Sequence, residues 1–122
     1  MAVLIVAGCS SNRNARIGAS IQQILTAQPG AAAESVRTEV DRFYKAREYA
    51  PVWVQDGDLL KVAGALGVLR SAEAHGLVAS DYGEDAIAGA IASEDQLDDS
   101  TKRLAQLDVD VTTNLLALGH DV

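Results

Sequence analysis

The sequence predicts an all-α protein, a small helical bundle of about four helices with an extended Pro/Trp segment after the first helix. Hydrophobic residues make up 48% of the chain but aromatic residues only 4%, so Ala, Leu and Val must fill most of the core, which favours packed helices. Apolar residues also recur at helical spacing in several stretches. A chain of 122 residues fits one domain, and the absence of a repeat with a period of about 20 to 50 residues argues against a solenoid.

Residues 1–33 are predicted to form a lipoprotein-like signal and a flexible tether. The apolar run at residues 2–8 leads to Cys9 and is followed at once by polar residues, which resembles a bacterial lipoprotein signal whose cysteine thiol is acylated. No Lys or Arg precedes the run, which departs from that pattern. Ser10 after the cysteine is consistent with sorting to an outer membrane. The alternative is a buried strand at residues 3–6, with Cys9 as a small hydrophobic residue.

Residues 10–33 are rich in Ala, Ser and Gln and contain a Pro-Gly breaker, so we expect a tether with at most a short helix around residues 17–25. The helical domain is expected to span residues 34–122 and to be truncated at its C-terminus. Its first helix begins near residue 34, because apolar side chains follow the spacing i, i+4, i+7 and i+8. This face contains Val36, Val40, Phe43 and Tyr44.

Four of the five aromatic side chains lie within residues 43–54. Pro51 disfavours a helical conformation at the preceding residue, so it is predicted to end the first helix and to leave residues 52–54 extended. We expect the four aromatic residues to be core anchors rather than a ligand platform, because burying each contributes about 2 kcal/mol to a marginally stable domain. They are Phe43, Tyr44, Tyr49 and Trp53.

Asp58 is predicted to cap a second helix that closes at His75-Gly76, since glycine accepts the left-handed conformation after a helix and a histidine suits the negative end of the helix dipole. Gly64 and Gly67 lie inside this helix and each costs about 1 kcal/mol relative to alanine. We therefore expect them to admit a neighbouring backbone or ring, with the tryptophan as the candidate. The buried side is expected to contain Leu59, Val62, Ala63, Leu66, Leu69 and Ala72.

Two more helices are predicted towards the C-terminus. The third is short, with Ser80 or Asp81 as its N-cap and with Ile87 and Ile91 four residues apart. The last spans about residues 100–118 and carries apolar residues at the spacing i, i+3, i+7, i+11 and i+14. These residues are Leu104, Leu107, Val111, Leu115 and Leu118.

The charge and the residue types exclude several functions. A net charge of −7 and a pI near 4.6 oppose binding to nucleic acid and to anionic lipid, so any membrane attachment is expected through the lipidated cysteine. One cysteine and two histidines cannot form a structural zinc site or an internal disulfide, and no metal or cofactor is expected. The acidic loop lacks the spacing of a calcium site and is expected to be solvated. Its acids are Glu94, Asp95, Asp98 and Asp99.

No catalytic motif is found, and no catalytic residue is assigned. His75 and His120 are the only plausible imidazole bases, and neither has a nucleophile in a recognisable motif. His75 is expected to serve as a helix end and His120 to be solvated. A third and weaker hypothesis treats the chain as a hydrolytic enzyme that uses His75 with nearby acids.

Three stretches together resemble a known family: FYKAREYAPVWV at residues 43–54, GDLLKVAGALGVLRSAEAHGLVASDY at 57–82 and LDVDVTTNLLALGHDV at 107–122. They are similar to the helical scaffold domain on the N-terminal side of YcbB-type murein L,D-transpeptidases, over about residues 36–122. Residues 78–80 depart from the Asp-Pro that the family commonly has there. The resemblance depends on Phe43, Tyr44, Arg47, Tyr49, Pro51, Trp53, His75, Gly76, Leu77, Asp81 and Tyr82.

The resemblance implies a non-catalytic scaffold domain of an L,D-transpeptidase-like protein, which acts in peptidoglycan crosslinking of the bacterial cell wall. The catalytic domain of that family, with its His and Ser-x-Gly-Cys motif, is absent from this sequence. The expected partners are a catalytic domain, another cell-wall protein or peptidoglycan, and the expected location is the periplasm-facing envelope, with a lipid anchor at Cys9. The alternative is a free-standing envelope lipoprotein whose helical domain binds a protein partner or peptidoglycan.

Overall fold

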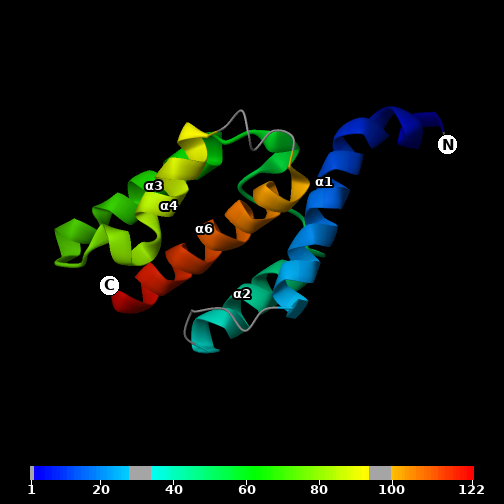
Figure 1. The fold of residues 1–122 in the computed structure, drawn as a ribbon. Helices are drawn as coiled ribbons and strands as arrows, with labels where there is room; N and C mark the ends of the chain where they lie inside the picture. The colour runs from blue at the N-terminus through cyan, green and yellow to red at the C-terminus, as the bar shows by residue number, and fades with distance from the viewer. Residues whose placement is uncertain (1, 28–33, 94–99) are drawn as a thin grey trace.

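The computed structural model describes residues 2–27, 34–93 and 100–122, with side chains from residue 12 onward (Figure 1). Over these residues the chain forms α-helices and short 3₁₀ turns, with no strand. The predicted all-α bundle is therefore confirmed. The α-helices are α1 (Ala2–Ala27), α2 (Glu34–Ala46), α3 (Leu60–Arg70), α4 (Glu84–Ala92) and α6 (Thr101–Asp121).

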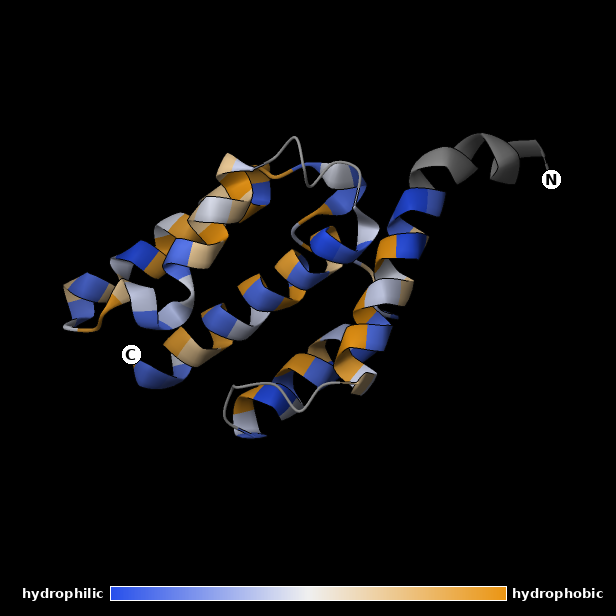
Figure 2. Ribbon diagram, viewed as in Figure 1, coloured by the Kyte–Doolittle hydropathy of each residue, from blue (hydrophilic) through white to orange (hydrophobic). Residues whose placement is uncertain are grey.

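Helix α6 forms the centre of the bundle. It contacts α1 and α2 on one side and α3 and α4 on the other (Figure 1). Hydrophobic and hydrophilic residues alternate along the helices in the manner of amphipathic helices around a shared core (Figure 2). The buried apolar residues of α6 are Leu104, Ala105, Leu107, Val109, Val111 and Leu118.

Helix α1 differs from the expectation for residues 10–33. Instead of a tether with a short helix, α1 packs along α6, and Ile17 and Ile21 are fully buried in the core. Gly18 also lets α1 approach the turn after α2, because a Cβ atom there would lie 2.8 Å from the carbonyl oxygen of Tyr49. The polar residues that suggested a tether point to solvent, while the isoleucines one turn apart face α6. The tether prediction is wrong for the described part of this helix.

The end of α2 reverses the chain before Pro51. Glu48 and Tyr49 adopt left-handed φ angles of 55° and 64°. The N–H of Tyr49 donates to the carbonyl of Tyr44 at 2.7 Å, and the N–H of Glu48 donates to the carbonyl of Lys45 at 3.1 Å. These two hydrogen bonds form a Schellman motif. It directs the residues that follow back across α6.

Helix α3 begins near the predicted place, but its N-cap position is Leu59 and not Asp58, and the helix does not pack as expected. The carboxylate of Asp58 accepts a hydrogen bond from the N–H of Leu60 at 2.9 Å. Gly64 and Gly67, however, are exposed, and a Cβ atom at either position would meet no atom within 4 Å. The prediction that they admit a neighbouring backbone or the tryptophan ring is wrong, because these residues lie on the outer side of α3.

The connection from α3 to α4 uses two left-handed glycines. Gly76, at φ 75°, closes the 3₁₀ turn that continues α3, as predicted. Ser80 and Asp81 do not cap α4, because both lie in the 3₁₀ turn Ala79–Tyr82, and Gly83, at φ 71°, occupies the N-cap position. A glycine suits this place since the left-handed conformation carries no steric cost there.

Helix α6 begins close to the predicted residue 100, and Ser100 is its N-cap. The side chain of Ser100 accepts a hydrogen bond from the N–H of Arg103 at 3.2 Å. None of the described helices combines the length and the hydrophobicity that crossing a membrane requires.

Candidate functional site

The segment at residues 52–54, after α2, encloses a buried carboxylate of α6. These residues were predicted to be extended, but they form a series of bends, with Val54 at φ −117° and ψ 30°, and this lets their N–H groups point to one side. Asp108 is fully buried, and its Oδ2 accepts three hydrogen bonds from consecutive backbone N–H groups. The donors are Val52 at 2.9 Å, Trp53 at 2.7 Å and Val54 at 3.1 Å. Its Oδ1 accepts a hydrogen bond from the hydroxyl of Tyr44. Successive amides that point at one oxygen form a nest for an anion, and here the anion belongs to the protein itself.

Thr112 lies one turn after Asp108 on α6 and joins the same network. Its Oγ1 is 2.8 Å from Nε1 of Trp53 and 2.7 Å from the hydroxyl of Tyr44. The indole N–H can only donate, and Tyr44 gives its single proton to the carboxylate, so Thr112 donates to Tyr44. We refer to Tyr44, Trp53, Asp108, Thr112 and the N–H groups of residues 52–54 as the Asp108 cluster.

Burial sets the acid–base behaviour of the Asp108 cluster. It raises the pKa of the Asp108 carboxyl, and the hydrogen bonds from Tyr44 and from the amides of residues 52–54 oppose this rise. Burial and the adjacent Asp108 raise the pKa of Tyr44 far above its ordinary value. Tyr44 therefore remains a neutral hydrogen-bond donor. The hydrogen bonds of Tyr44 and Asp108 thus join α2, the bent segment at residues 52–54 and α6.

The predicted aromatic anchors divide between this cluster and its surroundings. Tyr44 is fully buried in the cluster, Pro51 is buried beside it, and Trp53 is half-buried with its indole N–H bonded. Phe43 is half-buried and meets the ring of Tyr44 edge-on, with ring centroids 5.2 Å apart and planes at 88°. Tyr49 is half-buried beside α1, where its carbonyl oxygen approaches Gly18.

The remaining predicted residues lie on the other side of α6. His75 and Gly76 are exposed at the end of the turn that follows α3. Tyr82 is buried, and its hydroxyl donates to the carboxylate of Asp121 in the last turn of α6 at 2.7 Å. Among the described residues, His75 forms no hydrogen bond with any member of the Asp108 cluster.

Asp108 was missed by the sequence analysis, although the sequence holds a signal for it. The residue lies four positions after Leu104 and three before Val111, so it occupies a place on the apolar stripe of the last helix. An acidic residue at such a position requires buried hydrogen-bond donors. What the pattern could not show is which donors, because they come from residues more than 50 positions away in the sequence.

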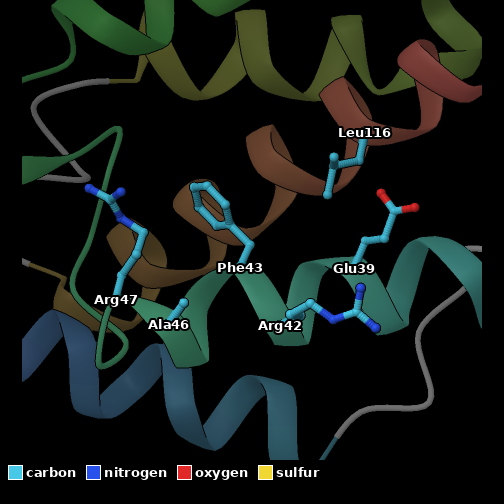
Figure 3. Close-up of a pocket in the computed structure, with 6 residues that line it drawn as sticks. All are labelled: Glu39, Arg42, Phe43, Ala46, Arg47 and Leu116. Carbon is cyan, nitrogen blue, oxygen red and sulfur yellow. The ribbon is translucent and has the colours of Figure 1, made fainter.

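A shallow groove of about 470 Å³ lies between α2 and α6 (Figure 3). Phe43 points from α2 towards α6, and Leu116 of α6 completes the apolar surface. The guanidinium of Arg47 lies over the ring of Phe43, with Cζ 5.4 Å from the centroid, at a distance that suits a cation–π contact. We call this the α2–α6 groove, and its lining consists of Glu39, Arg42, Phe43, Ala46, Arg47 and Leu116.

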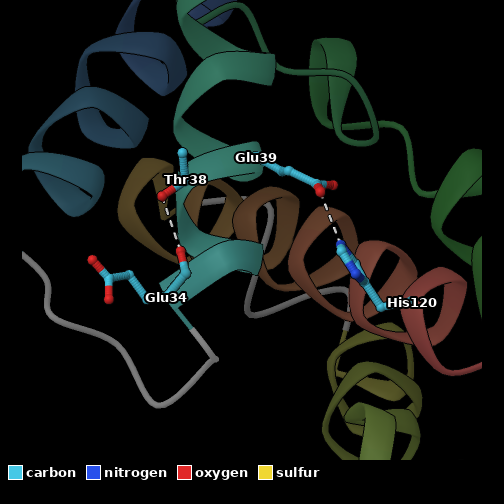
Figure 4. Close-up of polar contacts among 4 residues, drawn as sticks. All are labelled: Glu34, Thr38, Glu39 and His120. Carbon is cyan, nitrogen blue, oxygen red and sulfur yellow. Dashed lines mark hydrogen bonds and ion pairs between the residues drawn. The ribbon is translucent and has the colours of Figure 1, made fainter.

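A hydrogen bond joins α2 and α6 at the Glu39 side of the α2–α6 groove. Nε2 of His120, in the last turn of α6, lies 2.9 Å from Oε1 of Glu39 (Figure 4). On the neighbouring turn of α2, the hydroxyl of Thr38 donates to the carbonyl of Glu34 at 3.0 Å. The histidine expected to be solvated is exposed but links the two helices that form the groove.

No group of three or more His, Cys, Asp and Glu side chains in the described ranges could hold a metal ion. The acidic loop at residues 94–99 lies outside the described residues. The side chain of Cys9 also lies outside them, so its predicted lipidation stays a prediction.

The described residues form a helical bundle whose central carboxylate is bonded within the protein and whose α2–α6 groove is lined by apolar, basic and acidic residues. The chain belongs to the Scaffold domain family, which matches residues 38–122 and therefore includes most of α2 and every later helix. This family fits a non-catalytic scaffold role, and the match confirms the resemblance to the L,D-transpeptidase scaffold domain. Searches of curated proteins and of solved structures found no match.

Proposed function

We propose that this scaffold domain serves in peptidoglycan crosslinking, as the non-catalytic part of an L,D-transpeptidase-like protein of the bacterial envelope. The observation that carries the proposal is the family match over residues 38–122, because all three stretches that resemble the transpeptidase scaffold lie inside it. The Asp108 cluster is consistent with this role, since its carboxylate and phenol are taken up by internal hydrogen bonds. In this proposal the domain positions a catalytic domain and performs no chemistry itself.

The proposal is tested by removing the scaffold fold in cells. The substitution Asp108→Ala is introduced into the native gene, in a strain that lacks its other L,D-transpeptidase genes, and crosslinked muropeptides are measured by mass spectrometry. We expect the fraction of L,D-crosslinks to fall, because unpaired buried donors destabilise the domain. Asp110→Ala, on the same helix, is the matched control. An unchanged fraction in Asp108→Ala cells, with the domain shown to be unfolded, would contradict the proposal.

A second candidate function is a free-standing envelope lipoprotein whose helical domain binds a protein partner or peptidoglycan. The observation that favours it is the contribution of α1, outside the family match, to the same core through Ile17 and Ile21. An independent domain melts cooperatively and binds little hydrophobic dye, whereas a severed scaffold exposes an apolar face. A non-cooperative melt with strong dye binding would count against the lipoprotein candidate.

The proposed location is the periplasmic side of the envelope, with a lipid anchor at Cys9 and the outer membrane suggested by Ser10. Intact mass spectrometry of the protein purified from native membranes tests this point. A mass equal to residues 9–122 plus acyl chains supports a short lipoprotein. A much larger species supports the scaffold of a longer transpeptidase. An unmodified mass that includes residues 1–8 would exclude lipidation at Cys9.

A further inference from the structure

We propose that the α2–α6 groove docks an amphipathic helix of a partner protein, one that carries Asp or Glu beside an apolar stripe. This inference rests on the proposed function, because it specifies how the scaffold holds the protein that it positions. The groove is open to solvent and shallow, whereas small-molecule sites enclose most of their ligand. Its two walls are helices, and a third helix packs naturally along such a groove at about 8–10 Å from its neighbours.

The floor of the groove fits the apolar stripe of such a helix. Phe43 and Leu116 are both half-buried, so each presents apolar surface to solvent on one side and packs against the core on the other. Ala46 is small and exposed beside them, which leaves room for a large side chain of the partner. Covering these residues would remove apolar surface from water without moving the core.

The rim of the groove fits the carboxylates. Arg42 and Arg47 are exposed on the rim, and no carboxylate in the described part of the chain pairs with either of them. The single acid of the lining, Glu39, is already bonded to His120 at 2.9 Å. The groove is thus locally basic on a chain whose net charge is −7, so an acidic partner would be attracted to this face and repelled by much of the remaining surface.

The two arginines come from different parts of the groove. Arg42 belongs to α2, whereas Arg47 lies in the turn that follows the end of α2 at Ala46. Arg47 is held at the edge of the apolar floor by its contact with the ring of Phe43, and a guanidinium fork in a fixed position favours bidentate binding of a carboxylate.

The test uses the full chain and two fluorescein-labelled synthetic peptides in a fluorescence anisotropy titration. Both peptides carry the same leucine stripe at helical spacing, with Glu at the polar positions of the first and Gln at those of the second. We expect the Glu peptide to bind about tenfold more tightly, and we expect added salt to reduce the difference. Isolated peptidoglycan sacculi serve as a third probe in a sedimentation assay.

The variants Arg42→Glu and Arg47→Glu are each expected to weaken binding of the Glu peptide about tenfold or more. Lys45→Glu reverses a charge on the same helix but outside the groove, so it is expected to leave binding within about twofold of the wild type. Leu116→Ser tests the apolar floor and is expected to weaken both peptides. Circular dichroism melts show that each variant is folded.

Equal binding of the two peptides, or an equal loss in Lys45→Glu, would overturn the proposal. Sacculi that sediment the wild-type chain but not Arg42→Glu, with no binding of either peptide, would also overturn it and would assign the groove to the cell-wall polymer. These results are distinct from the muropeptide test. If L,D-crosslinks depend on the domain while the peptides do not bind, the proposed function stands and only the groove assignment fails.

Discussion

The two sides of α6 are held against it by different kinds of contact. On the side of α2 and the bent segment at residues 52–54, a buried carboxylate accepts hydrogen bonds from three backbone amides and a phenol. On the side of α3 and α4, the contacts are apolar, through residues such as Leu69 and Ile87, and the polar links lie at the periphery. Tyr82 donates a hydrogen bond to Asp121 at the end of α6, while the ion pair of Arg70 with Glu84 at 2.8 Å joins α3 to α4.

This difference explains how the bundle combines a defined geometry on one side of α6 with tolerance to substitution on the other. Hydrogen bonds to Asp108 are directional, so they fix one position of residues 52–54 on α6. Apolar packing accepts side chains of similar volume with little loss. We therefore expect the stability of the α2 side to depend on the hydrogen-bonding atoms of a few residues. The stability of the α3–α4 side should depend on the volume of its buried side chains.

The largest effect is expected at the centre of the Asp108 cluster. Asp108→Ala leaves three amides and the Tyr44 hydroxyl without their buried acceptor, and we expect it to lower the free energy of unfolding by about 3–5 kcal/mol. Urea unfolding followed by circular dichroism measures this change. Asp110→Ala removes a carboxylate two residues away, half-buried and bonded to Gln106, and should cost much less. Equal losses in the two variants would show that the cluster has no special role.

On the α3–α4 side, Leu69→Ala is expected to cost about 2–4 kcal/mol, because it leaves a cavity at a fully buried position. Leu69→Met keeps the volume and should cost less than about 1.5 kcal/mol. Leu60→Ala is the control, since Leu60 is 77% exposed. The near-isosteric Asp108→Asn makes the matching test on the other side. If it were tolerated as well as Leu69→Met, the distinction between chemistry and volume would be wrong.

A third effect depends on pH. Because the pKa of Tyr44 is raised in the folded protein, the unfolded chain releases this proton near pH 10 and the folded chain retains it. The folded state then binds more protons, so stability falls by about 1.4 kcal/mol per pH unit above pH 10 from this group alone. Melting temperatures at pH 9 to about pH 11 measure the fall. Tyr44→Phe should flatten this fall. Parallel curves for the wild type and Tyr44→Phe would contradict the assignment.

The sequence predicted best the helix that has a long stripe of regularly spaced apolar residues. The helix that became α6 has apolar residues at regular spacing, and they are found where expected. The end of α2 was predicted less well, because the helix ends at Ala46 and not at Pro51. A long periodic stripe depends only on spacing within one helix, so a single sequence contains it.

The features that the sequence could not predict depend on contacts between distant residues. Helix α1 has only two fully buried isoleucines, Ile17 and Ile21. It is part of the core because α6 lies beside it. The nest around Asp108 needs left-handed angles at Glu48 and Tyr49, where nothing in the residue types favours them. The α2–α6 groove exists only once Phe43 and Leu116 are brought together.

The smallest effect is a pair of glycine substitutions with opposite signs. Gly67→Ala, on the exposed side of α3, is expected to stabilise the protein by about 0.5–1 kcal/mol, since the added Cβ meets no atom within 4 Å and alanine favours the helix. Gly18→Ala gains the same propensity but places its Cβ 2.8 Å from the Tyr49 carbonyl oxygen, so it should destabilise the protein. Urea midpoints compare the two.

A gain in stability from Gly18→Ala would mean that α1 does not approach Tyr49 closely, and the contact of α1 with the α2 side would have to be revised. A loss from Gly67→Ala in the isolated chain would mean that the outer side of α3 is already covered, for example by a second copy. The expected outcome is a loss of stability in Gly18→Ala and a gain in Gly67→Ala. Both substitutions add the same methyl group to a helix, so the difference in sign would follow from the atoms that surround each methyl group. The sign of each change therefore reports directly on how closely each side of the bundle is packed.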